Sequence, residues 1–377
     1  MESLKIAFFC WESLHGERVG GLANAATHLA ETLARTHEVH FFTRGEADKE
    51  MNGVQYHFYQ PWGGNIIDYC RNMGVGMVER FHQYDQPKFD ILHFHDWHTV
   101  EALHLLQDRN TVLTYHSTEY GRNGNRFGDW WEYREISGKE WYGGLIAKRV
   151  TTVSQTLKDE VMRLYNVPDW KCDVIPNGVI PQAYRAPIDP GAVKQSYGIH
   201  PYAPLIMFIG RLAYQKGPDL LVDAVVAVHH HRWDAQVVIA GDGGMRNHLE
   251  NKARGLPVKF LGYIPDSAYL RLLNAADIVA IPSRNEPFGL VLLEAWSAGK
   301  CVVATNVGGL SENIDHSVNG IKVDVTPDSL AWGITNILDD PARVRSLGEK
   351  GQRKVERHFQ WIPIANSLVE SYKRVEN

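Results

Sequence analysis

Residues 277–299 carry the strongest fold signal in the chain and read DIVAIPSRNEPFGLVLLEAWSAG. Residues 277–281 form a short apolar, β-branched run, which indicates a buried strand. The following turn is punctuated by Pro287 and Gly289, and residues 290–298 carry apolar side chains on all sides, as a helix buried in a large domain does. A strand, a turn and a buried helix in this order are typical of an α/β protein.

This stretch places two glutamates in different settings. Glu286 lies in the loop at the carboxyl end of the expected strand, whereas Glu294 lies about two turns inside the helix. The backbone N–H groups of Gly289, Leu290 and Val291 would open that helix, and helix N-termini bind phosphate. A carboxylate beside them would suit sugar hydroxyls, which donate hydrogen bonds to it. The simpler alternative is one glutamate in a solvated loop and one on a helix surface.

Length and composition indicate a globular protein with two domains. The chain has 377 residues, of which 44% are hydrophobic and 22% charged, and this length exceeds what one core usually supports. A formal net charge of −5 argues against nucleic acid as the main partner. We expect a cytoplasmic protein without an integral membrane segment, because no apolar run reaches about 18 residues and no signal-peptide layout is present. The four cysteines form no C-x-x-C pair, so we expect no metal; monomer and homo-oligomer are both open.

Strand-like and helix-like segments alternate in two series. In the first, we expect strands at 5–10, 38–43, 54–59, 90–95, 111–116, 150–153 and 171–176, and helices at 22–36, 66–84, 99–107, 135–149 and 157–165. In the second, we expect strands at 205–209, 236–240, 258–261, 277–281, 301–305 and 321–323, and helices at 219–230, 245–253, 266–275, 290–298, 329–338 and 341–358. This alternation predicts two parallel sheets with functional loops at the carboxyl ends of their strands.

Two segments interrupt this alternation. Residues 117–137 are rich in glycine, asparagine, arginine and aromatic residues, and we expect an irregular, functional insert there. Residues 181–204 contain several prolines and no periodicity, which indicates a linker between the two series. The last segment, residues 361–374, is amphipathic and could dock on either half.

A basic loop follows the expected strand at 205–209. It runs from Gly210 to Gly217 and contains Arg211 and Lys216. An arginine can hold a diphosphate bidentately and a lysine acts on it as a point charge, so this loop suits a diphosphate. A solvated basic loop is the alternative.

Glycines at other strand ends permit close approach of the backbone to a ligand. Gly20-Gly21 follows the first expected strand and suits a diphosphate or a sugar, although a simple turn explains it equally well. Gly241 follows the strand at 236–240, in a sequence that fits the dinucleotide-binding fingerprint poorly. Main-chain groups of Gly262, Tyr263 and Ile264 would lie at a neighbouring strand end, where they could contact a nucleotide base.

Histidines end two strands of the first half. Period two places His93 and His95 on one face, while Asp96 falls in the following loop. No cysteine or glutamate cluster completes a zinc site with them. His116 ends the next strand, where contact with reacting groups and burial in the core are both reasonable.

Motifs of one enzyme family occur together and in order along the chain. They are Gly20-Gly21, His116, Asn177-Gly178-Val179, Gly210-Arg211-Leu212 with Lys216-Gly217, Ala240-Gly241-Asp242-Gly243, and Glu286-Pro287-Phe288-Gly289 with Glu294. From Lys5 to Trp361 the chain resembles the retaining glycosyltransferases of the GT-B fold, family 4. Residues 93–97 and 151–154 also resemble the glycogen and starch synthase branch, which uses nucleotide-glucose donors.

The resemblance implies an α/β protein of the GT-B fold, with two Rossmann-like parallel-sheet domains that face each other across a cleft. An acceptor domain would span residues 1–182, with a C-terminal helix at 360–377 packing back on it, and a donor domain would span 183–359. The implied activity is a metal-independent transfer of a hexose, most simply glucose, to a hydroxyl of a sugar or small molecule, with retention of configuration. The donor would be a UDP-, ADP- or GDP-linked sugar, with no further cofactor.

The resemblance also implies roles for individual residues. Arg211 and Lys216 would hold the donor diphosphate, Glu286 the transferred sugar and Glu294 the ribose. His116 and Asp96 would approach the transferred sugar and the acceptor, and Gly21 would face the diphosphate. Together with the loops described above, the resemblance gives a further set of expected donor-binding residues. They are Gly20, Gly210, Gly241, Gly262, Tyr263, Ile264, Phe288, Gly289, Leu290 and Val291.

The insert suggests where the acceptor binds. Residues 120–133 follow His116 closely, their rings can stack on sugar faces, and Glu119, Arg122 and Arg126 can bind hydroxyls or an anionic group. We therefore expect an ordered acceptor lid, with Asp96 beside it; rings packed under a surface loop are the alternative. The insert does not match the glycogen synthases, which argues against a polymeric glucan acceptor.

Other activities remain open from the sequence. Mannosyl or other hexosyl transfer to a glycolipid or polysaccharide fits the same motifs, and a nucleotide-sugar epimerase shares the fold. A phosphorylase would need a lysine that binds pyridoxal phosphate, which no motif marks. A noncatalytic nucleotide-sugar sensor would have little use for the Arg211 and Lys216 pair.

Overall fold

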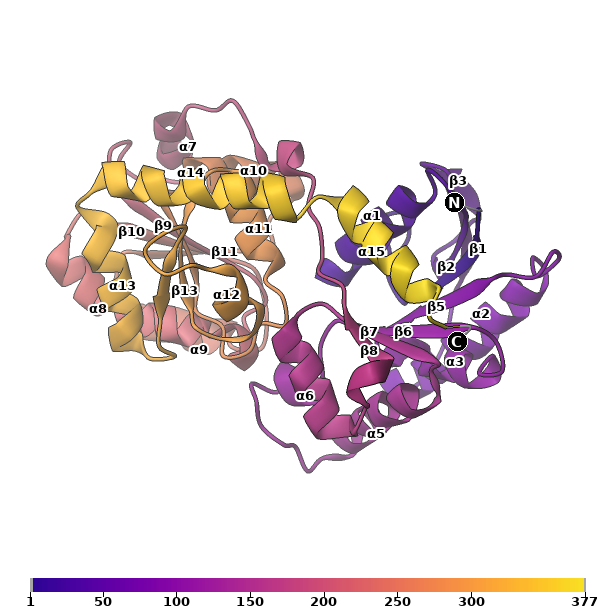
Figure 1. Cartoon of the computed structure of the whole chain (residues 1–377). Coiled ribbons are helices and arrows are strands. Elements are labelled where there is room, and N and C mark those ends of the chain that lie inside the picture. Colours follow the sequence, from indigo (N-terminus) through magenta and orange to yellow (C-terminus); the bar gives the residue numbers. More distant parts are fainter. Residues whose placement is uncertain (1–2, 376–377) are drawn as a thin grey trace. The chain divides into compact units, whose positions relative to one another are not determined.

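The computed structural model describes residues 3–375, which divide into two compact α/β units (Figure 1). Unit 1 contains the chain up to Tyr120, residues 127–178 and the chain from Trp361 onward; unit 2 contains residues 121–126 and 179–360. Residues 1–2 and 376–377, at the ends of the predicted first domain and its predicted C-terminal helix, lie outside the described residues. Within residues 3–375, no helix combines the length and apolar character needed to cross a membrane.

Unit 1 is built on an eight-stranded sheet that is parallel except at one edge. In spatial order its strands are β3 (Lys49–Met51), β4 (Val54–Tyr59), β2 (Glu38–Arg44), β1 (Lys5–Phe9), β5 (Ile91–His95), β6 (Thr111–Tyr115), β7 (Arg149–Thr152) and β8 (Cys172–Val174). The edge strand β3 pairs antiparallel with β4 and was not predicted. Its three side chains are all exposed, so no apolar pattern marked it.

Helices cover both faces of this sheet. They are α1 (Gly21–Leu33), α2 (Ile66–His82), α3 (Val100–Leu105), α5 (Trp131–Ile146), α6 (Gln155–Tyr165) and α15 (Trp361–Tyr372), with 3-10 turns η1 (Trp97–Thr99) and η2 (Asp169–Lys171). On one face, α1 and α15 pack together over an apolar cluster that includes Phe8 and Phe41. On the other, the rings of Phe9, Phe42 and Phe94 stack, and Phe81 of α2 contacts them.

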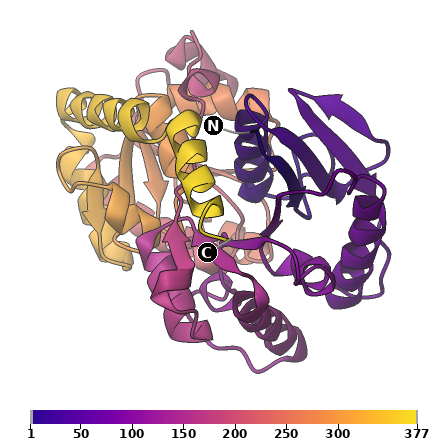
Figure 2. The same cartoon turned by 45° about the vertical axis from the view of Figure 1, so that its right-hand side comes forward.

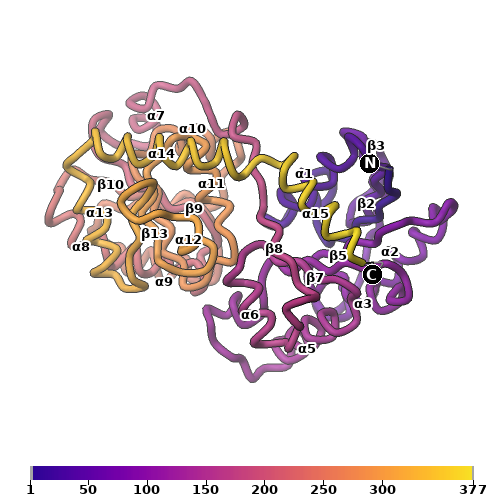
Figure 3. The backbone as a smooth tube through the Cα atoms, in the orientation of Figure 1, coloured from indigo at the N-terminus to yellow at the C-terminus, as the bar shows by residue number. Residues whose placement is uncertain are grey.

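The last helix of the chain is part of the unit 1 core, beside α1 (Figure 3). At its start, Trp361 lies directly over Gly178, where a Cβ atom would come within 2.6 Å of the indole. At its end, the Tyr372 hydroxyl bonds the buried His93 Nδ1 at 2.7 Å. The glycine and the histidine therefore fix both ends of α15 on the sheet.

Unit 2 is built on a six-stranded, wholly parallel sheet. In spatial order its strands are β11 (Val258–Gly262), β10 (Gln236–Ala240), β9 (Leu205–Ile209), β12 (Ile278–Ile281), β13 (Cys301–Thr305) and β14 (Ile321–Val323). Its helices are α7 (Pro190–Ser196), α8 (Pro218–His231), α9 (Arg246–Lys252), α10 (Asp266–Ala275), α11 (Leu290–Ser297), α12 (Gly308–Asn313), α13 (Pro327–Leu338) and α14 (Pro341–His358), with 3-10 turns η3 (Pro181–Tyr184) and η4 (Tyr214–Lys216).

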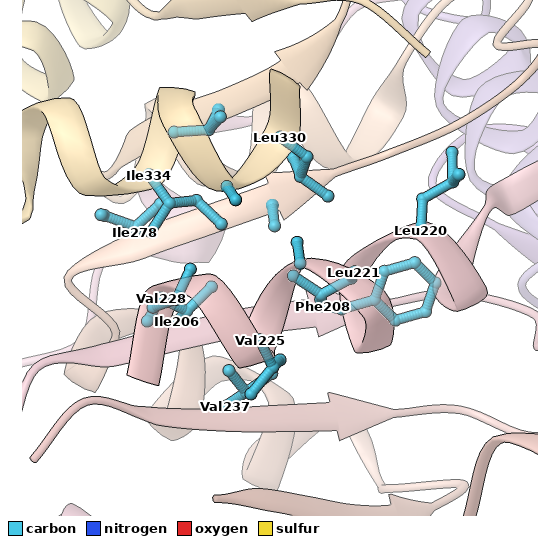
Figure 4. Close-up of a cluster of buried hydrophobic side chains, with 14 of the residues drawn as sticks. Ile206, Phe208, Leu220, Leu221, Val225, Val228, Val237, Ile278, Leu330 and Ile334 are labelled. Carbon is cyan, nitrogen blue, oxygen red and sulfur yellow. The ribbon is translucent and has the colours of Figure 1, made fainter. Parts of the chain in front are cut away.

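The main apolar cluster of unit 2 lies under α8 and α13. Leu221 and Val225 of α8 and Leu330 and Ile334 of α13 point toward strand residues such as Ile206 (Figure 4). Helix α14, in yellow, contacts α11 and β13 and is seen from a second direction in Figure 2. The strand interiors thus read as continuous apolar runs, as expected for a parallel sheet covered on both faces.

The insert that was predicted to be irregular contains helices, so that prediction was wrong in part, and the predicted linker contains helices as well. The insert at 117–137 contains the short α4 (Glu119–Arg122) and the first turns of α5. The predicted linker at 181–204 contains η3 and α7. Asp189 caps α7 by accepting hydrogen bonds from the amides of Gly191 and Ala192, and Pro190 is its first residue. Proline suits that position, so a residue that breaks helices elsewhere begins one here.

A buried histidine makes the stability of unit 1 depend on pH. His93 is fully buried, and its Nε2 lies 2.6 Å from Thr114 Oγ1. Burial lowers the pKa of His93 to about 3, with a smaller contribution from His116. In the unfolded chain a histidine pKa is about 6.5, so below that pH the unfolded state binds a proton that the folded state excludes. The stabilisation from neutral His93 is therefore present above pH 6.5 and is lost as the pH falls.

We predict that His93→Gln reduces the pH dependence of unfolding. Between pH 7 and pH 5, His93 should account for about 2 kcal/mol of the loss in unfolding free energy. Urea unfolding curves at both pH values measure this loss in the wild type and the variant. Replacement of the exposed His248 by Gln is the matched control and should leave the loss unchanged. Equal losses in wild type and His93→Gln would contradict the prediction.

Candidate active site

Lys216 and Glu286 form an ion pair at the carboxyl edge of the unit 2 sheet. The Lys216 Nζ lies 3.0 Å from Oε1 and 2.8 Å from Oε2 of Glu286, and Ser283 Oγ donates to Oε2 at 3.0 Å. Lys216 ends the turn that follows β9, and Glu286 lies in the loop after β12, which is the neighbouring strand. Because neighbouring parallel strands end at the same edge, two residues 70 positions apart in sequence meet there.

Gln215 links Arg211 to this pair. Arg211 donates to the Gln215 side-chain oxygen at 3.0 Å, and the Gln215 carbonyl accepts the amide of Arg284 at 2.7 Å. Arg284 in turn bonds both carboxylate oxygens of Asp219 at 2.8 and 2.6 Å. Burial alone would raise the pKa of Asp219, but the bonds from Arg284 outweigh it and hold the pKa below its ordinary value. The two loops are therefore joined by charge-assisted bonds.

Helix α11 begins beside Glu286. Gly289 takes a φ of 99°, which glycine adopts without strain, and its carbonyl accepts the first intrahelical bonds from Leu292 and Leu293. The amides of Leu290 and Val291 precede those bonds and lie at the positive end of the helix dipole. This end of α11 can therefore hold an anionic group.

Two tyrosines that the sequence analysis missed hold Glu294. Tyr184 donates to its Oε1 at 3.1 Å and Tyr269 donates to its Oε2 at 2.5 Å. Burial and the nearby Glu294 raise the pKa of Tyr269 well above its ordinary value, so this hydroxyl keeps its proton. Tyr269 entered the sequence analysis only as part of the expected helix at 266–275, and no sequence pattern pointed to Tyr184.

Gly308 and Gly309 pack directly against the backbone of the Glu286 loop. A Cβ at Gly308 would lie 2.0 Å from the Glu286 carbonyl oxygen, and one at Gly309 would lie 2.3 Å from that of Phe288. The Gly309 amide also donates to the Glu286 carbonyl at 2.9 Å. Larger residues at either position would displace the loop, which explains the Gly-Gly pair at the start of α12.

The other predicted glycines line one continuous set of loops. A Cβ at Gly241 would lie 2.0 Å from the Gly210 carbonyl oxygen, and the Gly241 amide donates to Gly262 at 2.7 Å. Beyond Gly262 the Tyr263 side chain is exposed and Ile264 is half-buried. The structure thus brings the predicted diphosphate and base loops together at one sheet edge.

Residues 121–126 belong to unit 2, although the chain on either side of them belongs to unit 1. Asn125 donates to the Arg284 carbonyl at 2.9 Å and accepts from Asn285 at 2.8 Å. The Arg126 guanidinium bonds the Tyr214 hydroxyl and lies 4.5 Å from the centre of its ring. The Arg126 guanidinium therefore already has a partner in Tyr214. Binding of the acceptor substrate by Arg126, like that by Arg122, stays a prediction.

In unit 1, a carboxylate that the sequence analysis missed holds the predicted glycine loop. Glu12 is buried, and its Oε2 accepts hydrogen bonds from the amides of Val19 at 2.5 Å and Gly20 at 2.7 Å. Burial raises the pKa of Glu12, and the two amides offset part of that rise. A diphosphate contact with Gly20 would have to displace Glu12, whereas a contact with Gly21, the first residue of α1, needs no such exchange.

Asp96 and His116 meet at the ends of β5 and β6. Asp96 Oδ1 accepts the His116 amide at 2.7 Å, and Asp96 has a φ of 58°, a strained conformation for a residue other than glycine. His116 Nε2 lies 3.0 Å from His95 Nδ1, and the His95 and His93 rings stack, so these two side chains lie on one face as predicted. Burial lowers the pKa of His116, with Asp96 opposing the shift, so His116 is neutral near pH 7. Asp96 thus positions the backbone of His116.

The backbone of Glu119 is held by the buried Glu140. Its amide donates to Oε2 of Glu140 at 2.9 Å, and the buried Glu140 also accepts from the Tyr165 hydroxyl.

Among residues 3–375, no cluster of three or more histidine, cysteine, aspartate or glutamate side chains has the arrangement of a metal site.

Both halves of the chain match families of known proteins. The family described as "Glycosyltransferase Family 4" matches residues 19–183, and that described as "Glycosyl transferases group 1" matches residues 192–354. An uncharacterized glycosyltransferase of Methanocaldococcus jannaschii is 36% identical over 386 residues, covering 98% of each chain. Glycogen synthase of Mycobacterium tuberculosis is 27% identical over 388 residues, covering 94% of this chain and 91% of the relative.

A solved structure shows the same fold. Sucrose-phosphate synthase from Thermosynechococcus elongatus superimposes with a TM-score of 0.81 at 22% identity, over 99% of both chains. The two family matches fall on the two halves of the chain, in the order in which its two sheets occur. The chain therefore belongs to the group 1 glycosyltransferases of family 4, which have the GT-B fold, and its activity is the transfer of a sugar.

Proposed function

We propose that this enzyme transfers glucose from a nucleoside diphosphate glucose to a hydroxyl of a sugar or small-molecule acceptor, with retention of configuration and without a metal ion. The observation that carries the proposal is the Lys216–Glu286 pair beside the start of α11. It sets a cation for the diphosphate next to a carboxylate for the sugar hydroxyls. The similarity to a glycogen synthase, an enzyme named for a polymer of glucose, supports glucose as the transferred sugar.

In the proposed reaction, the bond between the anomeric carbon and the diphosphate oxygen breaks, and the acceptor hydroxyl oxygen bonds to the same face of that carbon. The hydroxyl proton passes to the departing diphosphate. Negative charge grows on the diphosphate as the bond breaks, and Lys216, Arg211 and the α11 amides would stabilise it there. Preorganised cations of this kind do the work for which a divalent ion is used elsewhere, so the reaction should need no metal.

The carboxylates and the histidine would position the substrates. Glu286 has both oxygens directed by Lys216 and Ser283, so its remaining lone pairs can accept from hydroxyls of the transferred glucose. Glu294, oriented by two tyrosines, would accept from the ribose hydroxyls. His116 is held by His95 and Asp96, which leaves its Nδ1 as the ring nitrogen that can meet a sugar hydroxyl. A neutral imidazole suits that hydrogen bond better than a charged one.

We predict that Lys216→Ala lowers kcat/KM by roughly 10²-fold or more, the scale of losing one electrostatic donor. Turnover should fall more than donor affinity, because the diphosphate charge that Lys216 faces grows in the transition state. Steady-state kinetics with UDP-, ADP- and GDP-glucose measure both terms. Lys252→Ala removes a lysine of the same unit that pairs with Asp223, and it is the matched control. Near-normal turnover in Lys216→Ala would remove this lysine from the mechanism.

Activity should survive an excess of EDTA, because Arg211, Lys216 and the amides of α11 are expected to carry the charge stabilisation. Initial rates with and without chelator test this directly. The control is a metal-dependent phosphatase assayed in the same buffer, which must lose activity. If the transferase also lost activity, and Mg²⁺ or Mn²⁺ restored it, metal independence would be refuted.

Tyr269→Phe should weaken donor binding and leave chemistry nearly intact. The variant removes one hydrogen bond to the Glu294 carboxylate, worth about 1.5–3 kcal/mol for a bond to a charged group, so donor KM should rise about tenfold or more. The value of kcat should change little, because Glu294 is expected to touch the ribose and not the reacting carbon. Tyr202→Phe changes an exposed tyrosine hydroxyl of the same unit outside the predicted donor-binding set and serves as the control. A fall in kcat at unchanged KM would contradict the assigned role of Glu294.

A further inference from the structure

A cavity lies on unit 2, at the carboxyl ends of β13 and β14. Its volume is about 340 Å³, and its walls include Asn306, His316, Lys322, Asp324, Ser329 and Trp332. Asn306 directly follows β13, and Asp324 directly follows β14. Trp332 belongs to α13, whose residues Leu330 and Ile334 face the apolar core (Figure 4). Trp332 therefore lies on the outward side of that helix, with 51% of its surface exposed.

This cavity is distinct from the Lys216–Glu286 site. Helix α12 contacts both the active-site loop and the cavity. Its residues Gly308 and Gly309 lie against the Glu286 loop, while the Ser311 carbonyl accepts a hydrogen bond from Lys322 Nζ at 3.1 Å. No cavity-lining residue belongs to the predicted donor-binding set.

The polar groups of the cavity are fixed in a defined arrangement. His316 Nδ1 accepts the Lys322 amide at 3.1 Å, so its Nε2 carries the proton of the neutral ring and is a donor. Ser329 Oγ accepts the Asp324 amide at 2.9 Å, which holds the turn after β14. The Asn306 amide donates to the Val323 carbonyl at 2.8 Å. These backbone bonds leave the Asp324 carboxylate and the Asn306 side chain to face a ligand.

The charge of the cavity favours a neutral polar ligand. Its one carboxylate, Asp324, is matched by one ammonium group, Lys322, and the latter is bonded to a backbone carbonyl. A nucleotide or another phosphate would need an excess of cations. An exposed indole beside a ring donor, an amide and a carboxylate instead suits a sugar, which has an apolar face and a rim of hydroxyls. The Trp332 and His316 rings are nearly parallel, at an angle of 14°.

We propose that this cavity is a second saccharide-binding site, which holds a neutral oligosaccharide with one sugar ring against Trp332 and hydroxyls bonded to Asp324, Asn306 and His316. It would retain a glycan chain on the enzyme independently of the transfer reaction. The proposal rests on the cavity alone and holds whatever donor the enzyme uses.

Isothermal titration of the full chain with maltoheptaose, cellohexaose and mannohexaose tests the proposal. We expect at least one of them to bind with a Kd on the order of 1 mM or tighter. Trp332→Ala should weaken that binding about tenfold or more, as the loss of a stacking platform would. Trp233→Ala removes another exposed tryptophan of unit 2 outside the cavity, and it should bind as the wild type does.

Two further variants separate the sites. Glu286→Gln should retain oligosaccharide binding, because Glu286 does not line the cavity. Asp324→Asn should weaken binding without changing the thermal midpoint, which keeps the test valid if Trp332→Ala proves unstable. Transfer rates of Trp332→Ala with a small acceptor should match the wild type, so a failure of the proposed donor chemistry would be seen separately.

Three results would overturn the proposal. One is no binding of any of the three oligosaccharides, and another is equal affinity in the wild type and in folded Trp332→Ala and Asp324→Asn. The third is loss of binding in Glu286→Gln with full binding in Trp332→Ala, which would place the saccharide in the active site.

Discussion

The ion pair between Lys216 and Glu286 is the interaction on which the unit 2 site depends. Neither side chain is fully exposed, since 24% of the lysine and 11% of the glutamate side chain remain accessible. Removal of either partner would leave a charge in a partly desolvated place, which costs more than an exposed ion pair contributes. The surrounding backbone is shaped to permit the pair. Gly217, at a φ of 63°, lies so close to the Pro282 carbonyl that a Cβ would come within 2.0 Å of it.

The loops could be predicted from sequence because a parallel sheet makes local patterns sufficient. Each βα turn has its own glycine and charge signature, and the sheet order then brings the carboxyl ends of β9 and β12 together. The partners of individual carboxylates could not be predicted in this way. Tyr184 lies 110 residues from Glu294, and nothing local to either residue signals their bond. Glu12 has a fainter signal, as an acid between a strand and the Gly20-Gly21 pair, which only the folded loop makes meaningful.

The aromatic insert shows a second limit of sequence analysis. Its composition favoured a loop that reaches for a substrate, yet its central segment bonds protein groups. Gly121 lies against Asn285, and Gly124 at a φ of 68° lies against the Tyr214 ring, where any Cβ would collide. Tyr120 and Phe127, which flank this segment in the sequence and belong to unit 1, contact each other with ring centres 4.9 Å apart. Gly121 and Gly124 are required there for close packing. Composition alone does not distinguish a glycine in a substrate-binding loop from one that permits close packing.

In each unit, taken separately, a carboxylate bonds one of the groups predicted to meet the diphosphate. Glu286 accepts from Lys216 in unit 2, and Glu12 accepts from the Gly20 amide in unit 1. A bound diphosphate would therefore share or exchange these partners and would gain less than the full energy of each new bond. In the proposed reaction, this exchange would limit the stabilisation of the bound donor, whereas the negative charge that grows on the diphosphate in the transition state would still be stabilised by Lys216. Differential binding of this kind raises turnover, whereas stronger binding of the donor alone does not.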